Sequence, residues 1–255
     1  MPDAFSSEPE PGSAADVVRT WDARADHYLR LFRDELEGKP FDLDALNAFA
    51  ARVSEGGRVY DAGCGPCGHV AELLTSRGLD VLGIDLSPRC VALARRERPG
   101  CRFAVMDQQD IAGERLDGLV SYYSLHDRPK RELSGTLMSW AAAIRPGGQL
   151  LIVAKEGAHD GVVDDPLGGD LRVYWAEFTE YELRAAAGDA GFRIDDCTVR
   201  ESYDSEIPTR RIYLAATRLG LLGAERRRAD PSVRETSARR RPFVQLSAAD
   251  AGLDH

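Results

Sequence analysis

The sequence lacks the features that would place the protein in a membrane or on nucleic acid. None of its apolar runs approaches the roughly 20 residues that span a bilayer. Basic residues are in the minority, and the net charge of -9 disfavours a phosphate backbone as the main partner. The opening residues, MPDAFSSEPEPG, have neither the basic nor the apolar region of an export signal. We therefore predict a cytoplasmic protein with no membrane and no nucleic acid among its partners.

Cysteine is also scarce. The five cysteines are an odd number, and their spacing does not resemble a secreted disulfide framework. Cys64 and Cys67 form a Cys-x-x-Cys motif, but no second motif of that kind is present to complete a zinc site. We expect reduced thiols and no metal.

What is present suits one α/β domain with appendages, since 43% of the 255 residues are hydrophobic and 29% are charged. Residues 1–13 are acidic and rich in proline and serine, which predicts a disordered leader. Residues 14–56 hold two amphipathic helical patterns and are expected to form an N-terminal helical cap. Residues 57–218 are expected to form the main domain, and residues 219–255 a flexible Arg-rich tail.

Strand and helix patterns alternate through the main domain. Helical stretches of ten to fifteen residues separate the first five strand patterns, which predicts a parallel sheet with right-handed crossovers. The last two strand patterns are separated only by residues 201–209, a spacing that favours an antiparallel pair. A long Gly/Asp-rich stretch follows the fifth strand and is expected to be a functional loop. The expected strands are RVYDA, DVLGIDL, CRFAVMD, DGLVSYY, QLLIVAK, FRIDDCTVR and RRIYLAATR.

The loop after the first of these strands admits three interpretations. Cys64–Gly65–Pro66–Cys67 matches the active-site tetrapeptide of thioredoxin-like oxidoreductases. Gly63, Gly65 and Gly68 match the GxGxxG fingerprint of dinucleotide-binding proteins. Counted from Asp61, the same loop has the DxGxG pattern of S-adenosylmethionine sites.

Asp61 favours the third interpretation. A carboxylate next to the loop would raise a thiol pKa rather than lower it, which opposes redox chemistry. The same carboxylate would repel the pyrophosphate of a nicotinamide dinucleotide. S-adenosylmethionine carries no phosphate, and its ammonium and sulfonium groups are complementary to an acid at this position.

Several further segments, in the same order, resemble the class I S-adenosylmethionine-dependent methyltransferases, particularly the small-molecule branch common in actinobacteria. The resemblance covers roughly residues 20–218. It implies a Rossmann-like, doubly wound α/β fold with a mostly parallel seven-stranded sheet, an antiparallel last strand and the N-terminal helical cap. The segments that carry it are VYDAGCGPCG, GIDLSP, FAVMDQQD, LDGLVSYYSLHD and RPGGQLLIV.

The resemblance also implies which residues bind the cofactor. Asp61 would orient the ammonium, with a cap of the next helix as the alternative, and Asp85 would accept hydrogen bonds from both ribose hydroxyls. Tyr28 would approach the cofactor carboxylate, with core packing against Trp21 an equally weighted alternative. The whole predicted cofactor set is Tyr28, Asp61, Gly63, Gly65, Gly68, Asp85, Leu86, Asp107, Gln108 and Tyr122.

The reaction itself needs an aligned nucleophile and, for a hydroxyl acceptor, a base. His126 and Asp127 follow the fourth strand and are the predicted catalytic residues, with pocket shaping as the alternative for His126. Residues expected to contact the acceptor come from the end of that strand and from the long loop: Tyr123, Ser124, Tyr174 and Trp175.

Together these features predict a methyltransferase that acts on an oxygen or nitrogen nucleophile of a small molecule, as a monomer or homodimer. Two other functions stay open at this point. A nicotinamide-dependent reductase would be expected to lack Asp61 and to carry a Tyr-x-x-x-Lys pair, which is not found. A cofactor-binding regulator without turnover would keep Asp61 and Asp85 but lack a substrate cavity near His126.

Overall fold

The computed structural model describes residues 8–168 and 170–220. Of the predicted leader, residues 1–7 lie outside the described residues, and Ser13 donates its backbone N–H to the Glu10 carbonyl in a turn ahead of the first helix. Nearly all of the predicted tail, residues 221–255, also lies outside them.

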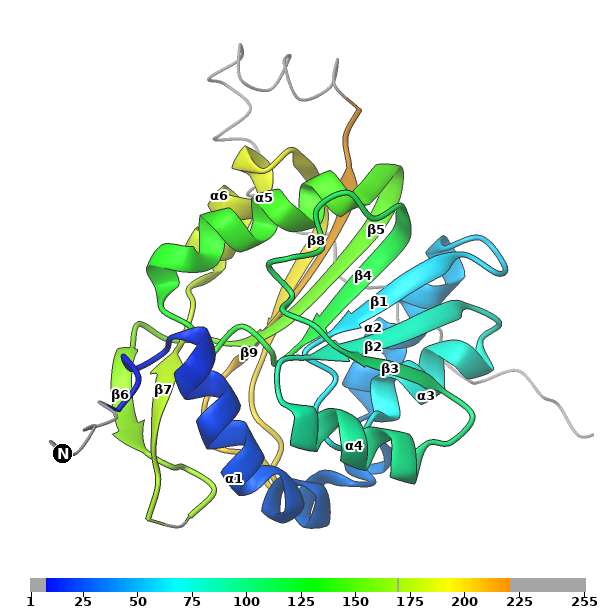
Figure 1. Ribbon diagram of the computed structural model, residues 1–255. Coiled ribbons are helices and arrows are strands. Elements are labelled where there is room, and N and C mark those ends of the chain that lie inside the picture. Colours follow the sequence, from blue (N-terminus) through cyan, green and yellow to red (C-terminus); the bar gives the residue numbers. More distant parts are fainter. Residues whose placement is uncertain (1–7, 169, 221–255) are drawn as a thin grey trace, which may run out of the picture. The chain divides into compact units, whose positions relative to one another are not determined.

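The helices and strands follow the predicted alternation (Figure 1). The helices are α1 (Ala14–Phe32), α2 (Pro40–Arg52), α3 (His69–Ser76), α4 (Pro88–Glu97), α5 (Leu133–Ala143) and α6 (Glu180–Asp189), with short 3-10 turns η1 (Glu35–Gly38) and η2 (Lys130–Glu132). The strands are β1 (Arg58–Ala62), β2 (Asp80–Asp85), β3 (Arg102–Val105), β4 (Leu116–Tyr122), β5 (Ile144–Lys155), β6 (Asp160–Asp164), β7 (Arg172–Ala176), β8 (Phe192–Arg200) and β9 (Arg211–Arg218).

Seven strands form the main sheet in the order β3-β2-β1-β4-β5-β9-β8. The pairs among β1 to β5 are parallel, whereas β9 runs antiparallel to both β5 and β8. The predicted doubly wound sheet with an antiparallel last strand is confirmed. This order places the carboxyl ends of β1, β2 and β4 side by side at one edge, where α/β sheets bind their ligands.

Both faces of the sheet are buried, and β5 shows why. Leu150 and Ile152 belong to the core that includes Trp140 of α5, while Leu151 and Val153 belong to the core that includes Phe49 of α2. Successive side chains of a strand point to opposite faces, so a continuous apolar run fills both cores. The same run ends at Lys155, at the edge of the sheet.

The helix α1 begins where its sequence provides a cap. The Ser13 side chain accepts a hydrogen bond from the backbone N–H of Asp16, which satisfies one of the free amides at the helix start. Farther along, α1 packs against α4, and Trp21 and Arg24 both donate to the carboxylate of Asp127 beyond β4. The helix is thereby fixed across the carboxyl edge of the sheet (Figure 1).

The stretch after β5 differs from the predicted loop. It contains β6 and β7, which pair as an antiparallel hairpin with Trp175 opposite Gly161. Val173 and Trp175 are buried while Tyr174 between them is half-buried, and this alternation is that of a strand rather than of a first helical turn. The Ala176 N–H donates to the His126 carbonyl at 2.8 Å and ties the hairpin to the β4 exit.

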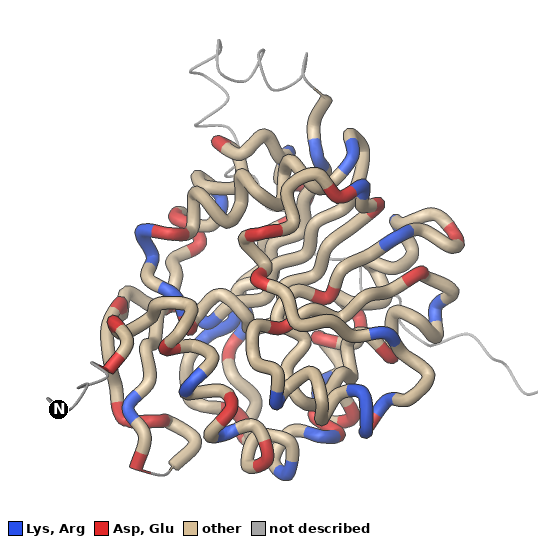
Figure 2. Tube along the Cα trace, viewed as in Figure 1, with Lys and Arg blue, Asp and Glu red and all other residues tan. Residues whose placement is uncertain are grey.

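Two broader features of the described residues concern the apolarity of the helices and the distribution of charge. Across residues 8–168 and 170–220, the structure contains no helix of the length and apolarity that crossing a bilayer requires. Acidic and basic residues are interspersed along the described chain (Figure 2).

Candidate active site

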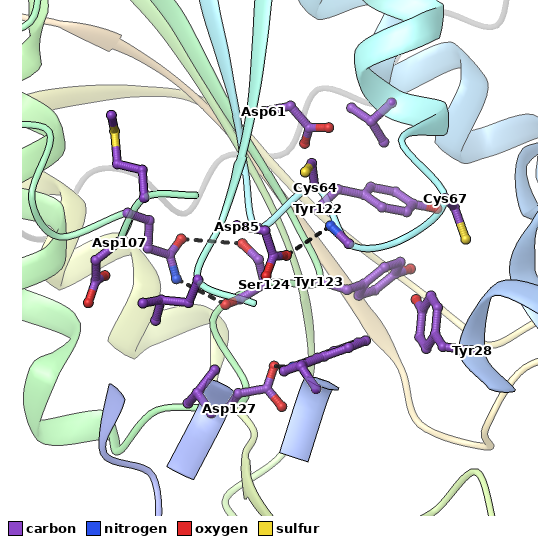
Figure 3. Close-up of a pocket in the computed structure, with 18 of the residues that line it drawn as sticks. Tyr28, Asp61, Cys64, Cys67, Asp85, Asp107, Tyr122, Tyr123, Ser124 and Asp127 are labelled. Carbon is purple, nitrogen blue, oxygen red and sulfur yellow. Dashed lines mark hydrogen bonds between the residues drawn. The ribbon is translucent and has the colours of Figure 1, made fainter. Parts of the chain in front are cut away.

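A cleft opens at the carboxyl edge of the sheet, between the loops after β1, β2 and β4 and the helix α1 (Figure 3). Of the ten residues predicted to bind the cofactor, nine line it: Tyr28, Asp61, Gly63, Gly65, Asp85, Leu86, Asp107, Gln108 and Tyr122. The acceptor candidates Tyr123 and Ser124 and the catalytic candidate Asp127 line it too. Residues separated by about 100 positions in the sequence therefore meet in one place.

The glycine loop adopts backbone conformations that other residues rarely take. Gly63, Gly65 and Gly68 all have positive φ angles, of 73°, 60° and 60°. A Cβ atom on Gly63 would lie 2.2 Å from the Cβ of Ser124, so the loop can approach the β4 exit only with glycine. Gly68 differs from its prediction, because its α-carbon faces the ring of Phe103 rather than the cleft.

We expect the Gly63→Ala variant to lose cofactor binding and about 2–4 kcal/mol of stability, because it combines a positive φ with a backbone-proximal clash. Chemical denaturation and calorimetric titration measure the two effects. Gly100→Ala is the matched control, since a Cβ there meets no atom within 4 Å and its φ is not positive. If the two variants had the same stability and the same affinity for the cofactor, the claim that only glycine at position 63 lets the loop approach Ser124 would be refuted.

Asp61 is a buried carboxylate that forms no ion pair with any of the described residues. Its residue is 1% exposed, and neither carboxylate oxygen accepts a hydrogen bond of ordinary geometry. Burial raises the pKa of Asp61 to about 7, although the backbone N–H of Ala71 in α3 opposes the shift, and the nearby charge of Asp85 raises the pKa further. An isolated carboxylate in such a place is costly unless a cation joins it. The side chain is therefore suited to an ammonium group inside the cleft.

Asp85 lies between the other two predicted carboxylates of the cleft, Asp61 and Asp107 (Figure 3). Its oxygens accept hydrogen bonds from the backbone N–H of Gly65 at 3.0 Å and of Ser87 at 2.8 Å. Burial raises the pKa of Asp85 to about 6, although these two amides oppose the shift. The carboxylate thus connects the glycine loop to the end of β2 and keeps further lone pairs for a ligand in the cleft.

The adenine-contact candidates are held by side chains from several elements. Asp107 accepts from the backbone N–H of Gln109 and lies 3.5 Å from a guanidinium nitrogen of Arg128. The Gln108 side chain donates to the Ser124 carbonyl, and the backbone carbonyl of Gln108 accepts from the indole N–H of Trp140 at 2.9 Å. These contacts fix the Asp107 end of the cleft.

The cysteines do not form a redox site. Cys64 and Cys67 are both buried free thiols at the wall of the cleft. Burial raises the pKa of Cys64 and raises that of Cys67 to about 12, so both are protonated at neutral pH. A thioredoxin-like site needs the opposite shift.

Tyr28 packs against Trp21 and also lines the cleft, so its position suits both of the roles predicted for it. Its ring packs edge-on against Trp21, with centroids 5.1 Å apart, and contacts Phe32. It also lines the cleft, on the side opposite Asp107 (Figure 3). Packing and ligand contact are therefore compatible at this residue.

The two catalytic candidates lie in different settings. Burial lowers the pKa of His126 to about 3, so its ring is neutral and only weakly basic. Asp127 accepts from Trp21 at 3.0 Å and from Arg24 at 2.9 Å, and its carboxylate lies 3.5 Å from His126. Burial opposes ionisation of Asp127, but the Arg24 guanidinium and the hydrogen bond from Trp21 outweigh it and lower the pKa. Asp127 is thus an ionised anchor for α1.

A second cavity, of about 460 Å³, adjoins the cleft and shares Trp21, Tyr28 and Tyr123 with it. His126 and Trp175 line this cavity, as expected for acceptor contacts. Tyr123 between the two spaces has a positive φ of 55°, an uncommon conformation for a residue with a side chain. The volume is that of a small-molecule site.

Two acceptor candidates lie elsewhere. Tyr174 is on the other face of β7, where its hydroxyl donates to Asp160 at 2.8 Å, and it lines neither of these two cavities. Ser124 lines the first cleft alone, and its hydroxyl lies 2.8 Å from that of Ser121. The strand geometry of β7 explains the first case, because neighbouring residues point to opposite faces.

The sequence interpretation missed most of the charged lining of the second cavity: Arg24, Glu35, Lys39, Lys155, Glu206 and Arg211. One of them carried a usable signal. Lys155 ends a long apolar strand at the carboxyl edge of the sheet, the same position relative to β5 that drew attention to His126 after β4. The others come from α1, from η1 and the residue after it, from the loop before β9 and from the start of β9, segments that only the fold brings together.

Comparison with known proteins agrees with this geometry. Residues 59–148 match the family model described as a methyltransferase domain. This part of the chain is similar to the class I S-adenosylmethionine-dependent methyltransferases. The match covers β1 to the start of β5, which includes the glycine loop and Asp85.

Curated relatives of this methyltransferase chain include two bacterial enzymes. It is 34% identical over 147 residues to the trans-aconitate 2-methyltransferase of Methylobacterium nodulans, covering 52% of this chain and 48% of that one. It is 33% identical over 165 residues to the ubiquinone biosynthesis O-methyltransferase of Methylocella silvestris, covering 62% of each. The matched region thus spans about half to three fifths of these relatives.

Solved methyltransferase structures share the fold at lower identity. The 1,6-didemethyltoxoflavin-N1-methyltransferase of Burkholderia thailandensis superposes with a TM-score of 0.63 at 21% identity, covering 86% of this chain and 98% of that one. The magnesium protoporphyrin IX methyltransferase of Synechocystis gives 0.63 at 20% identity, covering 84% and 100%. These likenesses concern the fold.

Proposed function

We propose that the protein transfers the methyl group of S-adenosylmethionine to an oxygen or nitrogen nucleophile of a small molecule. The family supports this activity, as do relatives that are named for small substrates. The toxoflavin and protoporphyrin enzymes, with which it shares the fold, are known with S-adenosylhomocysteine or S-adenosylmethionine bound. We further propose that it works in the cytoplasm as a monomer or homodimer, as its sequence predicts.

The observation that carries the proposal is the buried carboxylate of Asp61, which has no cationic partner among the described residues. A buried anion that accepts no hydrogen bond of ordinary geometry fits the ammonium of S-adenosylmethionine and repels a pyrophosphate. Asp85 would hold the ribose hydroxyls, and Leu86, Asp107 and Gln108 would surround the adenine. Tyr28 and Tyr122 complete the wall of the cleft.

When bound, S-adenosylmethionine supplies a methyl group on a sulfonium, which is transferred in line to the nucleophile. The chain contributes alignment and exclusion of water rather than a strong acid. Because His126 is neutral, its ring can accept a hydrogen bond from an acceptor hydroxyl and orient that hydroxyl. With a pKa near 3, the ring is a poor proton carrier at neutral pH. Asp127 is a positioning residue that fixes α1 over the site.

The second cavity favours turnover over a purely regulatory role. A regulator without turnover has no need of a substrate cavity near His126, yet one of about 460 Å³ is present beside the cofactor cleft. Tyr123 separates the two spaces, so an acceptor in one would face a cofactor in the other.

Calorimetric titration tests the cofactor assignment. We expect S-adenosylhomocysteine to bind with a dissociation constant in the micromolar range, on the order of -8 kcal/mol, and NADH and NADPH not to bind. Binding of a nicotinamide nucleotide in its place would overturn the assignment and revive the reductase. Transfer of labelled methyl from S-adenosylmethionine to a small-molecule panel then tests turnover.

A further inference from the structure

The second cavity has a charged wall. Four cationic side chains line it, from α1, from the residue before α2, from β5 and from β9: Arg24, Lys39, Lys155 and Arg211. Only two carboxylates line it with them, Glu35 and Glu206. Buried charges in proteins are normally paired, so cations without a partner indicate where a ligand anion fits.

Two of the four cations each have two carboxylates close by that compensate their charge, although the Nε of Arg24 has no hydrogen-bond partner among the described residues. Arg24 lies 2.9 Å from Asp127 and 3.6 Å from Asp165. Lys39 lies 2.5 Å from Glu35 and 2.8 Å from Glu206. These four charged partners leave Arg24 and Lys39 no need of a further anion.

Lys155 is different. Its ammonium lies 4.2 Å from the ring centre of Trp175 and 5.4 Å from that of Tyr123, and no carboxylate of the described residues lies within 4 Å of it. Burial lowers the pKa of Lys155 to about 7, with Arg211 and Arg24 acting in the same direction and Asp127 and Glu35 against it. The two aromatic rings attract the ammonium but carry no net negative charge. The charge of Lys155 therefore stays available to an anion that binds in the cavity.

Arg211 is the second cation of this cavity whose charge the protein does not fully compensate. The residue is 3% exposed, and its guanidinium donates to the carbonyls of Thr209 and Ile207. Its Nε has no hydrogen-bond partner and lies 3.7 Å from Glu206. That carboxylate is already shared with Lys39 and with Arg200, so it compensates Arg211 only in part.

We propose that Lys155 and Arg211 bind a carboxylate of the methyl acceptor in the second cavity, an inference that rests on the function proposed above. A single negative charge suits the site, since Lys155 is the cavity cation among the described residues that has no carboxylate partner. The body of this acceptor is mainly apolar, because aliphatic and aromatic residues form most of the uncharged wall, which includes Leu31, Phe32, Pro166, Leu167 and Ile207 beside the polar Ser205.

The test compares acids with their uncharged isosteres. Benzoate, cinnamate and 3-methylbutanoate, and the matching primary amides, are titrated into the full-length protein saturated with S-adenosylhomocysteine, at pH 7. We expect at least one acid to bind about 10- to 100-fold more tightly than its amide, as a charge-assisted contact provides. Lys155→Met should abolish that preference, whereas Lys155→Arg should keep it.

Lys130→Met is the matched control. Lys130 is also a lysine near an aromatic ring, 5.7 Å from that of Phe178, but it pairs with Glu182 at 3.1 Å and lines neither of the two cavities. The acid preference should survive this change. Proton uptake on binding, measured in buffers of different ionisation enthalpy, should accompany the acids in the wild type and vanish in Lys155→Met.

The outcomes separate the two proposals. If the wild type binds S-adenosylhomocysteine but no acid more tightly than its amide, the anion site is wrong while the proposed function stands. An acid preference that persists in Lys155→Met overturns the anion site equally. If S-adenosylhomocysteine does not bind, the proposed function fails, and the acid titrations repeated without it decide on the anion site alone.

Discussion

Replacement of Asp61 by asparagine is expected to weaken the binding of S-adenosylhomocysteine at pH 8 by about 10- to 100-fold. The amide keeps the shape of the side chain and removes its charge. In the wild type the affinity should fall by about tenfold for each pH unit below 7, since Asp61 has a pKa of about 7 and must be ionised to hold an ammonium. The variant should lack that part of the pH dependence.

The same substitution is expected to stabilise the fold. Burial raises the pKa of Asp61 above its unfolded value, so the folded state holds the proton more tightly. The stability that this proton contributes is complete below about pH 4, falls as the pH rises toward 7 and is lost above it. At pH 8 the ionised wild-type side chain therefore costs on the order of 2–4 kcal/mol, and Asp61→Asn should raise Tm by about 5–10 °C.

Thermal unfolding at pH 8 and pH 5, without cofactor, measures this effect. The gain in Tm should be smaller at pH 5, where the wild-type Asp61 is protonated. Asp164→Asn is the matched control, because the Asp164 side chain is 96% exposed and should change neither stability nor binding. A less stable Asp61→Asn variant with unaltered binding would mean that the carboxylate serves the fold and not a ligand.

Replacement of Asp85 by alanine is expected to weaken S-adenosylhomocysteine binding by about 100-fold or more, the larger of the two binding effects. The change removes the acceptors for two ribose hydroxyls, each contact to a charged group being worth about 1.5–3 kcal/mol. It also releases the N–H groups of Gly65 and Ser87, which loosens the glycine loop.

Asp80→Ala separates the ligand effect from the strand effect. Asp80 begins the strand that Asp85 ends, is half exposed and pairs with Arg102 at the opposite edge of the sheet. Calorimetric titration should find its affinity unchanged. If both variants lost comparable affinity for S-adenosylhomocysteine, the loss would come from damage to β2 and not from a ligand contact in the cleft.

Much of the fold could be predicted because its signals are local. Ser13, Ser87 and Thr179 cap α1, α4 and α6 with their own side chains, and each cap is readable from a few neighbouring residues. The strand patterns fixed the sheet class for a similar reason, since a continuous apolar run fits a strand buried on both faces. The hairpin β6–β7 was missed because its alternation is short and surrounded by Gly and Asp residues.

The cofactor cleft was predictable to the same degree. Asp61, the glycines and Asp85 follow directly after strands, and parallel strands bring their carboxyl ends to one edge. The order of the strands along the chain and their parallel direction were therefore enough to predict that these residues lie together. Gly68 shows the limit, because whether a loop glycine faces a ligand or Phe103 depends on packing that spacing does not contain.

The sequence by itself determined the α/β class, the likeness to methyltransferases and the residues that gather in the cleft, since these depend on short-range patterns repeated strand by strand. Only the tertiary structure decided the chemistry of the second cavity. It paired Asp127 with Arg24 from a helix 103 positions away, which makes the carboxylate an anchor, and it left Lys155 without a counter-ion. Whether a charged side chain is buried and paired depends on its neighbours in space. These neighbours decide which charges the protein compensates itself and which are left available to a ligand.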